Sequence, residues 1–263
     1  NALLSLNPDE LRKGVATHSS GNHAQALALA AKMIGIKATI VMPEDSPTVK
    51  KNAVAGYGAD IVFCKPTLES REETLGKIIK EKGCVFIHPY DNPNVIAGQG
   101  TAAKEMLESV QKLDFIIAPV GGGGLISGIA TYIKETNPSI VVIGVEAEVC
   151  PAMKIAIQNG KPVKLESASS LADGIAVKSV GEITYEIVKK YVDDVITVEE
   201  EEIANAVLLL LEIEKIVVEG AGAVPLAALI NKKINLKNKK VLSIISGGNI
   251  DVNILNRIIT QGL

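Results

Sequence analysis

The chain has 263 residues, 47% of them apolar, and a formal net charge of −3. This is enough apolar material for one large or two smaller globular domains. The weak negative charge and the lack of a basic run give no field that would attract nucleic acid. No apolar stretch reaches the ~20 residues that span a bilayer, and no signal segment opens the chain. We therefore expect a cytoplasmic protein with neither nucleic acid nor membrane as a partner.

Short apolar runs alternate with helical patterns, which is typical of βα units with parallel strands. In the first part of the chain, the predicted elements are strand 15–17, helix 22–35, strand 38–42, helix 47–55, strand 61–63, helix 69–82 and strand 85–87. In the second part they are helix 93–110, strand 115–120, a helix from residue 125, strand 140–145, helices 151–158, 181–192, 199–216 and 220–231, strand 241–245 and a closing helix. We expect an α/β fold of two open, mainly parallel sheets flanked by helices. A small domain, 1–93, and a large domain, 94–263, would face each other across a cleft.

Cysteines and histidines form no pattern typical of a metal site. The three cysteines, Cys64, Cys84 and Cys150, include no C-x-x-C pair, and the three histidines have no zinc-ligand spacing. We expect buried free thiols and no bound metal. The acidic run Glu199 to Glu202 is explained by solvent-facing residues at a helix N-terminus.

Four consecutive glycines, Gly121 to Gly124, lie between a predicted strand and a predicted helix. Without Cβ atoms this turn can adopt positive φ and bring several backbone N–H groups together at the positive end of the helix dipole, where phosphate binds well. A tight turn that binds nothing is the alternative, although each glycine costs about 1 kcal/mol relative to alanine. The G-x-G-x-x-G and P-loop patterns are absent, so we expect a phosphomonoester rather than a dinucleotide.

Two further polar turns follow predicted strands, and open parallel sheets bind ligands at such strand ends. Ser19 to His23 combines hydroxyls, an amide and an imidazole at a helix start, a set suited to a carboxylate and a phenolic oxygen. A simple helix cap by Ser20 or Asn22 is the alternative. Ser246 to Asn249 places a hydroxyl before two glycines, where a flat ring can approach the backbone, but it too could be only a cap.

With these turns the chain resembles the threonine dehydratase and serine racemase family, pyridoxal-phosphate enzymes of the tryptophan-synthase-β type. The resemblance covers essentially all 263 residues. Six motifs carry it in order: residues 17–25, 95–101, 121–125, 171–174, 218–223 and 246–249. The resemblance implies fold type II, with pyridoxal 5'-phosphate in the cleft between the two domains.

The resemblance also implies residue roles. The implied cofactor-binding residues are Asn22, Gly121, Gly122, Gly123, Gly124, Leu125, Gly174 and Ser246. Among these, Asn22 would bind the phenolic oxygen and Ser246 would face the pyridine nitrogen. The implied substrate-binding residues are Ser19, Ser20, Gly21, Asn22, His23 and Arg71. Ser20 would also act as a catalytic acid or base, while a solvated arginine at a helix start explains Arg71 nearly as well.

Two departures from the family pattern matter. The Schiff-base lysine of the family lies in a Ser-Phe-Lys motif upstream of the serine-rich turn, and no lysine of this chain matches it. We therefore expect the native protein to have a further segment before Asn1. Racemases of the family also have a glutamate and, six residues later, an aspartate that bind a divalent cation. Here Glu146 is followed at that distance by Ala152, which weakens such a site and favours a dehydratase.

We therefore expect a lyase that converts L-threonine to 2-oxobutanoate and ammonia, and also L-serine to pyruvate. The family suggests a homodimer or homotetramer. Two alternatives stay open: a serine racemase with serine dehydratase activity, and a lysine-lacking, non-catalytic cofactor-binding fragment.

Overall fold

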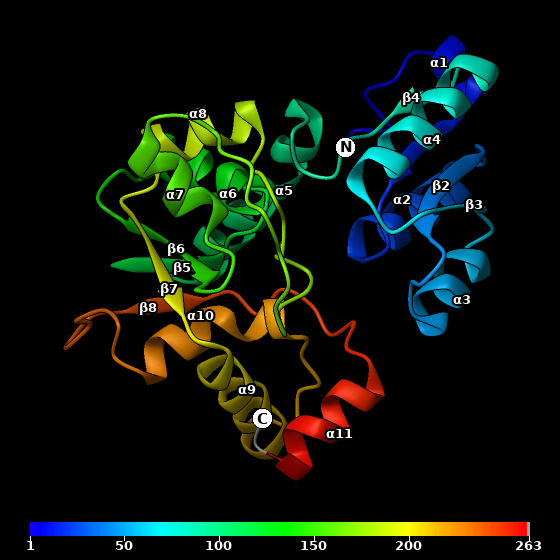
Figure 1. Ribbon diagram of the computed structural model, residues 1–263. Coiled ribbons are helices and arrows are strands. Elements are labelled where there is room, and N and C mark those ends of the chain that lie inside the picture. The colour runs from blue at the N-terminus through cyan, green and yellow to red at the C-terminus, as the bar shows by residue number, and fades with distance from the viewer. Residues whose placement is uncertain (262–263) are drawn as a thin grey trace. The chain divides into compact units, whose positions relative to one another are not determined.

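The computed structural model describes residues 1–261, so the last two residues of the expected large domain lie outside the described residues. The chain divides into two compact units, which we call unit 1 (Asn1–Val95) and unit 2 (from Ile96) (Figure 1). Each unit contains one four-stranded sheet in which every strand pair is parallel. The expectation of two parallel sheets flanked by helices is confirmed.

Unit 1 is a βα repeat whose sheet has the order β3-β2-β1-β4. Its elements are α1 (Pro8–Lys13), β1 (Val15–His18), α2 (Asn22–Ile34), β2 (Ala38–Pro43), α3 (Thr48–Gly56), β3 (Asp60–Cys64), α4 (Leu68–Lys82), β4 (Val85–Phe86) and the start of α5 (Pro93–Ser109). Successive residues of β1 point to opposite faces, so Val15 packs with α2 and α3 while Ala16 packs with α4. Both faces are buried, which explains why the strands are apolar throughout.

Unit 2 has the sheet order β7-β6-β5-β8. Its elements are β5 (Phe115–Pro119), α6 (Gly124–Thr136), β6 (Val141–Ala147), α7 (Ala152–Asn159), α8 (Glu182–Tyr191), β7 (Asp194–Val198), α9 (Glu200–Leu209), a π-helical turn η1 (Leu210–Glu214), α10 (Gly220–Ile230), β8 (Val241–Ser243) and α11 (Val252–Gln261). Ile116 faces the core formed with α6, α7 and α8, and Ile117 faces the core formed with α9, α10 and α11. The sheet therefore lies between two helical layers.

Helices α5 and α6 contact each other through their backbones. A Cβ on Gly128 of α6 would lie 2.2 Å from the carbonyl oxygen of Ile96 and 2.6 Å from the nitrogen of Gly100, both on α5. Only glycine allows this approach, because any side chain would separate the two helices. The helix that follows the four glycines is therefore held directly against its neighbour.

The structure differs from the sequence-based prediction in three elements. Strand β7 was not predicted, and it forms the edge of the sheet beside β6. The predicted helix 199–216 ends in η1, after which Lys215 adopts positive φ. Strand β8 ends at Ser243, and the closing helix begins only at Val252. The Ser246 to Asn249 turn is therefore not a cap of that helix.

Candidate functional site

The four glycines follow β5 at the point where the strand order of unit 2 reverses. The chain continues from β5 to β6 and β7 on one side, while β8 lies on the other side of β5. Ile117 pairs with Ser243, and the N–H of Ile244 donates to the carbonyl of Ile117 at 3.0 Å. The Gly121 and Ser246 turns thus leave the carboxyl ends of adjacent strands. Ligands of open α/β sheets bind at this topological switch point.

A row of backbone donors is open at the glycine turn. In residues 1–261, the N–H groups of Gly121 through Leu125 donate to no protein acceptor, and the first helical bond of α6 runs from Ser127 N to Gly123 O at 2.9 Å. Gly122, Gly123 and Gly124 are buried. An unsatisfied buried donor costs about 1–3 kcal/mol, so these groups favour an anionic acceptor at the helix N-terminus.

Close packing behind the turn explains why two of its positions must be glycine. Gly123 has φ +96°, and a Cβ there would lie 2.8 Å from both Thr184 Cβ and Met153 Cε. A Cβ on Gly121 would lie 2.9 Å from Ile175 Cα. Side chains at these positions would displace the turn, so the open row of donors depends on glycine.

The predicted Gly174 belongs to the turn that packs on Gly121. This turn is closed by Ile175 N donating to Ala172 O at 2.9 Å. It is fixed on its other side by Glu200, whose carboxylate accepts from Ser170 Oγ and Leu171 N, both at 2.6 Å. The solvent-facing interpretation of the acidic run is therefore wrong for Glu200, because this side chain fastens the segment before Gly174.

The Ser246 turn is joined to the start of helix α10. The N–H of Glu219 donates to the carbonyl of Gly247 at 3.0 Å, and a Cβ on Gly222 would lie 2.9 Å from that same oxygen. Ser246 itself is exposed. Unit 2 therefore brings together Gly121 to Gly124, Gly174 and Ser246, all cofactor-binding predictions.

In unit 1, the Ser19 to His23 turn follows β1, which lies between β2 and β4 at the corresponding reversal of strand order. The N-cap of α2 is Gly21, which lies between Ser20 and Asn22 and makes no side-chain cap bond. The cap explanation for Ser20 and Asn22 is therefore wrong. Ser19 Oγ instead accepts the N–H of Gly21 at 3.3 Å and shapes the turn. The positive end of the α2 dipole at this turn would favour a carboxylate.

The structure adds a residue that the sequence did not indicate. His88 follows β4, and its ring centroid lies 6.2 Å from that of His18, the last residue of β1. Asp91 N donates to His88 Nδ1 at 2.8 Å, which places the proton of the neutral ring on Nε2. Its position could have indicated it, because His88 directly follows the predicted strand 85–87, as Ser19 follows β1.

Burial keeps the histidines of unit 1 neutral. Burial, followed by the charges of His88, Arg71 and His23, lowers the pKa of His18 to about 4. Burial also lowers the pKa of His23, whose Nε2 lies 3.0 Å from the carbonyl oxygen of Ile87. The imidazole of His23 is thus already engaged, and its backbone N–H is what it can offer to a carboxylate.

Arg71 lies at the same edge of unit 1. It is on the first turns of α4, and its charge acts on His18, next to the Ser19 turn. Its Nε is buried and has no hydrogen-bond partner among the described residues. A buried guanidinium nitrogen without an acceptor fits an anionic ligand better than a solvated surface arginine.

Glu146 is buried at the end of β6 and already has partners. Its two carboxylate oxygens accept the N–H groups of Met153 at 2.7 Å and Lys154 at 2.9 Å, in the first turn of α7. Burial raises the pKa of Glu146 to about 7. Among residues 1–261, no three His, Cys, Asp or Glu residues are grouped as metal ligands.

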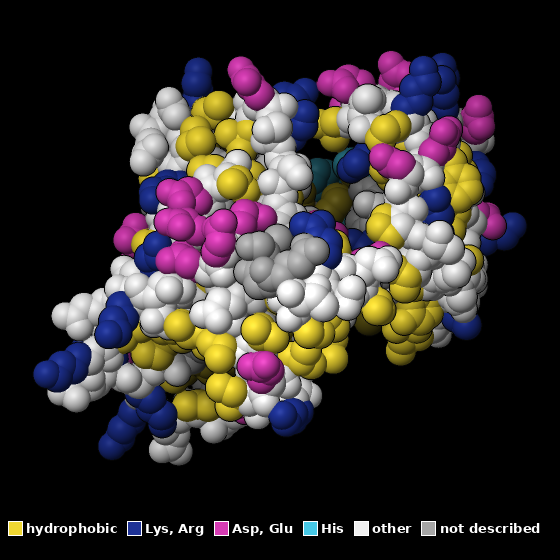
Figure 2. All heavy atoms as spheres, turned by 60° about the horizontal axis from the view of Figure 1, so that its bottom comes forward, with side chains coloured by type: hydrophobic (Ala, Val, Ile, Leu, Met, Phe, Trp, Pro, Cys, Tyr) yellow, Lys and Arg dark blue, Asp and Glu magenta, His cyan; other side chains and the backbone are white. Residues whose placement is uncertain are grey.

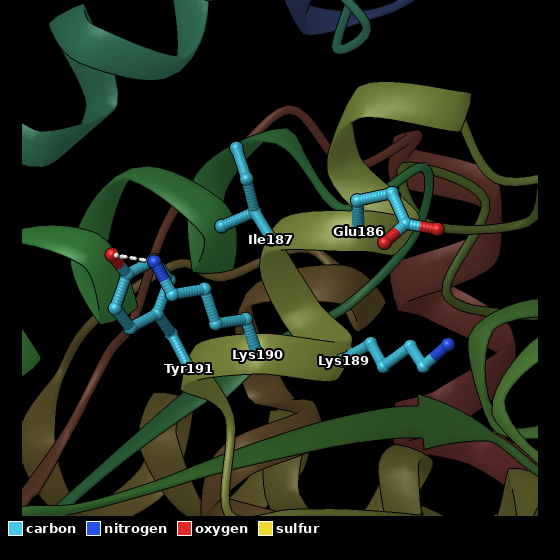
Figure 3. A pocket seen from close by; sticks show the side chains of 5 residues that line it. All are labelled: Glu186, Ile187, Lys189, Lys190 and Tyr191. Atoms are coloured by element: carbon cyan, nitrogen blue, oxygen red, sulfur yellow. Dashed lines mark hydrogen bonds between the residues drawn. The ribbon is translucent and has the colours of Figure 1, made fainter.

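Other surface features lie apart from these turns. A shallow pocket on α8 is lined by Glu186, Ile187, Lys189, Lys190 and Tyr191, none of them a predicted site residue (Figure 3). There Lys190 donates to the hydroxyl of Tyr191 at 2.8 Å. On the face in Figure 2, lysines and arginines are scattered and acidic side chains form a cluster. Within the described part of the chain, no helix is long and apolar enough to cross a membrane.

Comparison with known proteins identifies the family to which the chain belongs. A family model described as pyridoxal-phosphate dependent enzyme matches residues 1–247, and the chain belongs to this family. The chain is 48% identical to an L-threonine ammonia-lyase of Thermotoga maritima over 263 residues, covering 100% of this chain and 65% of that protein. It is 44% identical to a catabolic L-threonine dehydratase of Staphylococcus aureus, covering 77% of it. The chain thus spans less than two thirds of the length of the Thermotoga relative.

Solved structures agree with this class. The fold matches the processed form of threonine deaminase isoform 2 from Solanum lycopersicum with a TM-score of 0.92 and 34% identity, covering 100% of this chain and 77% of that one. It also matches the serine racemase of Dictyostelium discoideum with a TM-score of 0.89 and 46% identity, covering 95% of this chain and 81% of that one.

The residues present fit the cofactor that defines the family. The phosphate of pyridoxal phosphate carries several acceptor oxygens and negative charge. The row from Gly121 to Leu125 offers the matching set of open N–H donors at a helix N-terminus. The tight packing at Gly121 and Gly123 explains why no side chain obstructs that row.

Proposed function

We propose that the protein containing this chain is an L-threonine ammonia-lyase that also deaminates L-serine. The open N–H donors from Gly121 to Leu125 carry this proposal, because in a chain of this family they would suit the phosphate of the cofactor. The substrate class is supported by the relatives described above as threonine ammonia-lyase, dehydratase and deaminase. Overall, threonine would lose its β-hydroxyl and amino group and leave as 2-oxobutanoate and ammonia.

In unit 2, Gly121 to Gly124 and Leu125 would hold the phosphate, with the Gly174 turn packed behind them. Ser246 would hydrogen-bond the pyridine nitrogen. From unit 1, Asn22 would bind the phenolic oxygen. When bound, pyridoxal phosphate supplies an electron sink for negative charge at the substrate Cα.

The remaining unit 1 residues would act on the amino acid. The backbone N–H groups of Ser20 and His23 donate to no acceptor in the described residues and would hold the substrate carboxylate, with Ser19 and Gly21 shaping the turn. Arg71, whose Nε is buried without an acceptor, would add a positive charge. Ser20 Oγ would move a proton on one face of the substrate.

The test is product analysis with the full-length protein. We expect 2-oxobutanoate and ammonia from L-threonine, and pyruvate from L-serine, together with an absorption band of bound cofactor near the visible edge. The proposal is wrong if threonine yields no oxo acid while the cofactor is bound. We also propose that the protein is cytoplasmic and forms a homodimer or homotetramer. Light scattering of the purified protein would test the oligomeric state.

Serine racemase is the second candidate, and its support is the 46% identity to the Dictyostelium discoideum enzyme. The engagement of both Glu146 oxygens by Met153 and Lys154 favours the dehydratase, because it leaves this carboxylate poorly placed to bind a hard cation. Chiral analysis of unreacted serine, with and without magnesium, separates the two activities.

A non-catalytic cofactor-binding role is the third candidate. It is suggested by the sequence, because no lysine of this chain matches the Ser-Phe-Lys motif. The coding sequence upstream of Asn1 decides the point. A lysine in that context there would eliminate this candidate, and its absence would eliminate the lyase.

A further inference from the structure

We infer that Thr184 is a positioning residue that sets the direction of the backbone donors in the glycine turn, and so determines preference for a phosphorylated over an unphosphorylated cofactor. This inference rests on the proposed phosphate role of Gly121 to Gly124. Thr184 lies in the first turn of α8, is fully buried, and is 62 residues from Gly122 along the chain. It does not belong to any of the six sequence motifs.

The Thr184 hydroxyl joins two backbone segments. Its Oγ1 donates to the carbonyl of Gly122 at 2.6 Å, and it accepts the N–H of Gly181 at 3.1 Å. The carbonyl of Gly181 is also near, at 3.2 Å, but a hydroxyl has one proton and the shorter contact to Gly122 is the stronger one. The carbonyl of Gly122 also accepts the N–H of Gly181 at 3.5 Å, so the glycine turn is attached to the start of α8 by a short bond from this side chain and a longer one from the backbone.

The bond to Gly122 fixes the orientation of the next N–H. In a trans peptide the C=O and N–H bonds point in opposite directions. Because the Gly122 carbonyl points at Thr184, the N–H of Gly123 in the same peptide points away from α8. Gly123 N–H is in the middle of the open donor row. Without the hydroxyl, only the longer bond from the N–H of Gly181 would hold this carbonyl, and the peptide could rotate and turn that donor away from a ligand.

The packing of Thr184 against the turn is a separate feature from its hydrogen bond. A Cβ on Gly123 would lie 2.8 Å from Thr184 Cβ and 3.0 Å from its Oγ1, so the turn rests on this side chain. Valine would keep this packing and lose the hydrogen bond, whereas serine would keep the hydrogen bond and lose a methyl group. The two substitutions therefore separate orientation from packing.

The experiment compares cofactor affinities in the full-length protein after removal of bound cofactor. Pyridoxal 5'-phosphate and pyridoxal are titrated into wild type, Thr184→Val, Thr184→Ser and the control Thr131→Val. Thr131 Oγ1 donates to Ser127 O at 2.8 Å within α6 and serves as a threonine hydroxyl that does not contact the turn. The ³¹P NMR shift of the bound phosphate is recorded for each protein, as a readout independent of activity.

We expect Thr184→Val to weaken pyridoxal-phosphate binding about tenfold, which is the loss of one net hydrogen bond, and to shift the ³¹P signal. Pyridoxal affinity should stay within about twofold in every variant, and Thr184→Ser and Thr131→Val should bind both compounds like wild type. Equal losses for both compounds, or no loss for either, would overturn the inference.

The outcomes also separate this inference from the proposed function. If wild type does not prefer pyridoxal phosphate over pyridoxal, the phosphate role of the glycine turn fails. If wild type prefers it and Thr184→Val prefers it equally, only the role of Thr184 fails. If the valine variant does not fold, Thr184→Ser still tests the inference. This variant keeps the hydroxyl, so the loss of its preference for pyridoxal phosphate over pyridoxal would contradict the role of the hydrogen bond.

Discussion

Lys134 Nζ lies 2.7 Å from Asp193 Oδ2, and the same carboxylate oxygen accepts the N–H of Val142 at 2.7 Å. This pair connects α6, the segment before β7 and the start of β6. The side chain of Lys134 is only 14% exposed, so the pair is more protected from solvent than the Arg12–Asp9 pair, in which both side chains exceed 70% exposure.

We therefore expect Asp193→Asn to lower the free energy of unfolding by about 1–2 kcal/mol, since it leaves a largely buried ammonium without its counter-ion. Asp9→Asn, at the exposed pair, should change it by less than about 0.5 kcal/mol. Denaturant unfolding of both variants measures the difference. Equal effects would mean that burial of the pair does not matter.

Glu146 predicts a pH dependence of stability. Burial raises the pKa of this carboxyl from 4.5 to about 7. The folded state thus favours the neutral form, so its contribution to stability is fully present below the unfolded pKa and is lost as pH rises through 7. The shift corresponds to roughly 3 kcal/mol.

We expect the unfolding free energy of wild type to fall relative to Glu146→Gln by up to that amount between about pH 5 and pH 8. Denaturant melts at the two pH values measure it, with the exposed Glu105→Gln as the control. A constant difference between wild type and Glu146→Gln across this range would show that the carboxyl does not titrate there.

Gly123 and Gly160 both have positive φ, but only Gly123 is enclosed by side chains. Gly160→Ala should cost about 1 kcal/mol from backbone strain alone. Gly123→Ala adds overlap with Thr184 and Met153 and should cost about 2 kcal/mol or more. Cofactor titration should detect weaker binding in Gly123→Ala and unchanged binding in Gly160→Ala; weakening in both would point to a general effect of destabilisation.

His18 predicts acid sensitivity of unit 1. Its pKa falls from 6.5 in the unfolded chain to about 4, mainly through burial. The unfolded state therefore binds the proton first, and the stability that the neutral ring contributes is lost as pH falls from 6.5 toward 4. NMR titration should find the His18 ring neutral at pH 5.5, and His18→Gln should move acid unfolding to lower pH. A ring already protonated at pH 5.5 would contradict this.

Ser19 shapes the carboxylate turn through its bond to Gly21. We expect Ser19→Ala in the full-length enzyme to raise KM for threonine several-fold and to leave the thermal midpoint nearly unchanged, because a hydrogen bond of 3.3 Å at a partly buried site adds little stability. Steady-state kinetics and thermal unfolding test this together. A fall in the midpoint without a change in KM would assign Ser19 to folding alone.

Most of the architecture could be predicted from the sequence, because apolar periodicity and turn residues mark strands, helices and turns within short segments of the chain. The glycine run and the Ser19 turn stood out for that reason. Strand β7 was missed because its five residues are placed between two helices without a glycine or proline boundary. Thr184 could not be predicted, because its partner Gly122 is brought to it only by the packing of α8 on the turn. The closing helix was placed too early because residues 244–251, which include the Ser246 to Asn249 turn, form neither helix nor strand.

The contact of Gly128 with the backbone of α5 bears on the thermodynamics of ligand binding. Helix α6 packs directly on α5 at Gly128, with no side chain between the two backbones. The glycine turn that precedes α6 should therefore lose little conformational entropy when an anion binds. The entropic penalty of ordering the protein should then be small. We expect calorimetry of inorganic phosphate binding to give a favourable enthalpy from charge-assisted hydrogen bonds, with a heat-capacity change near zero.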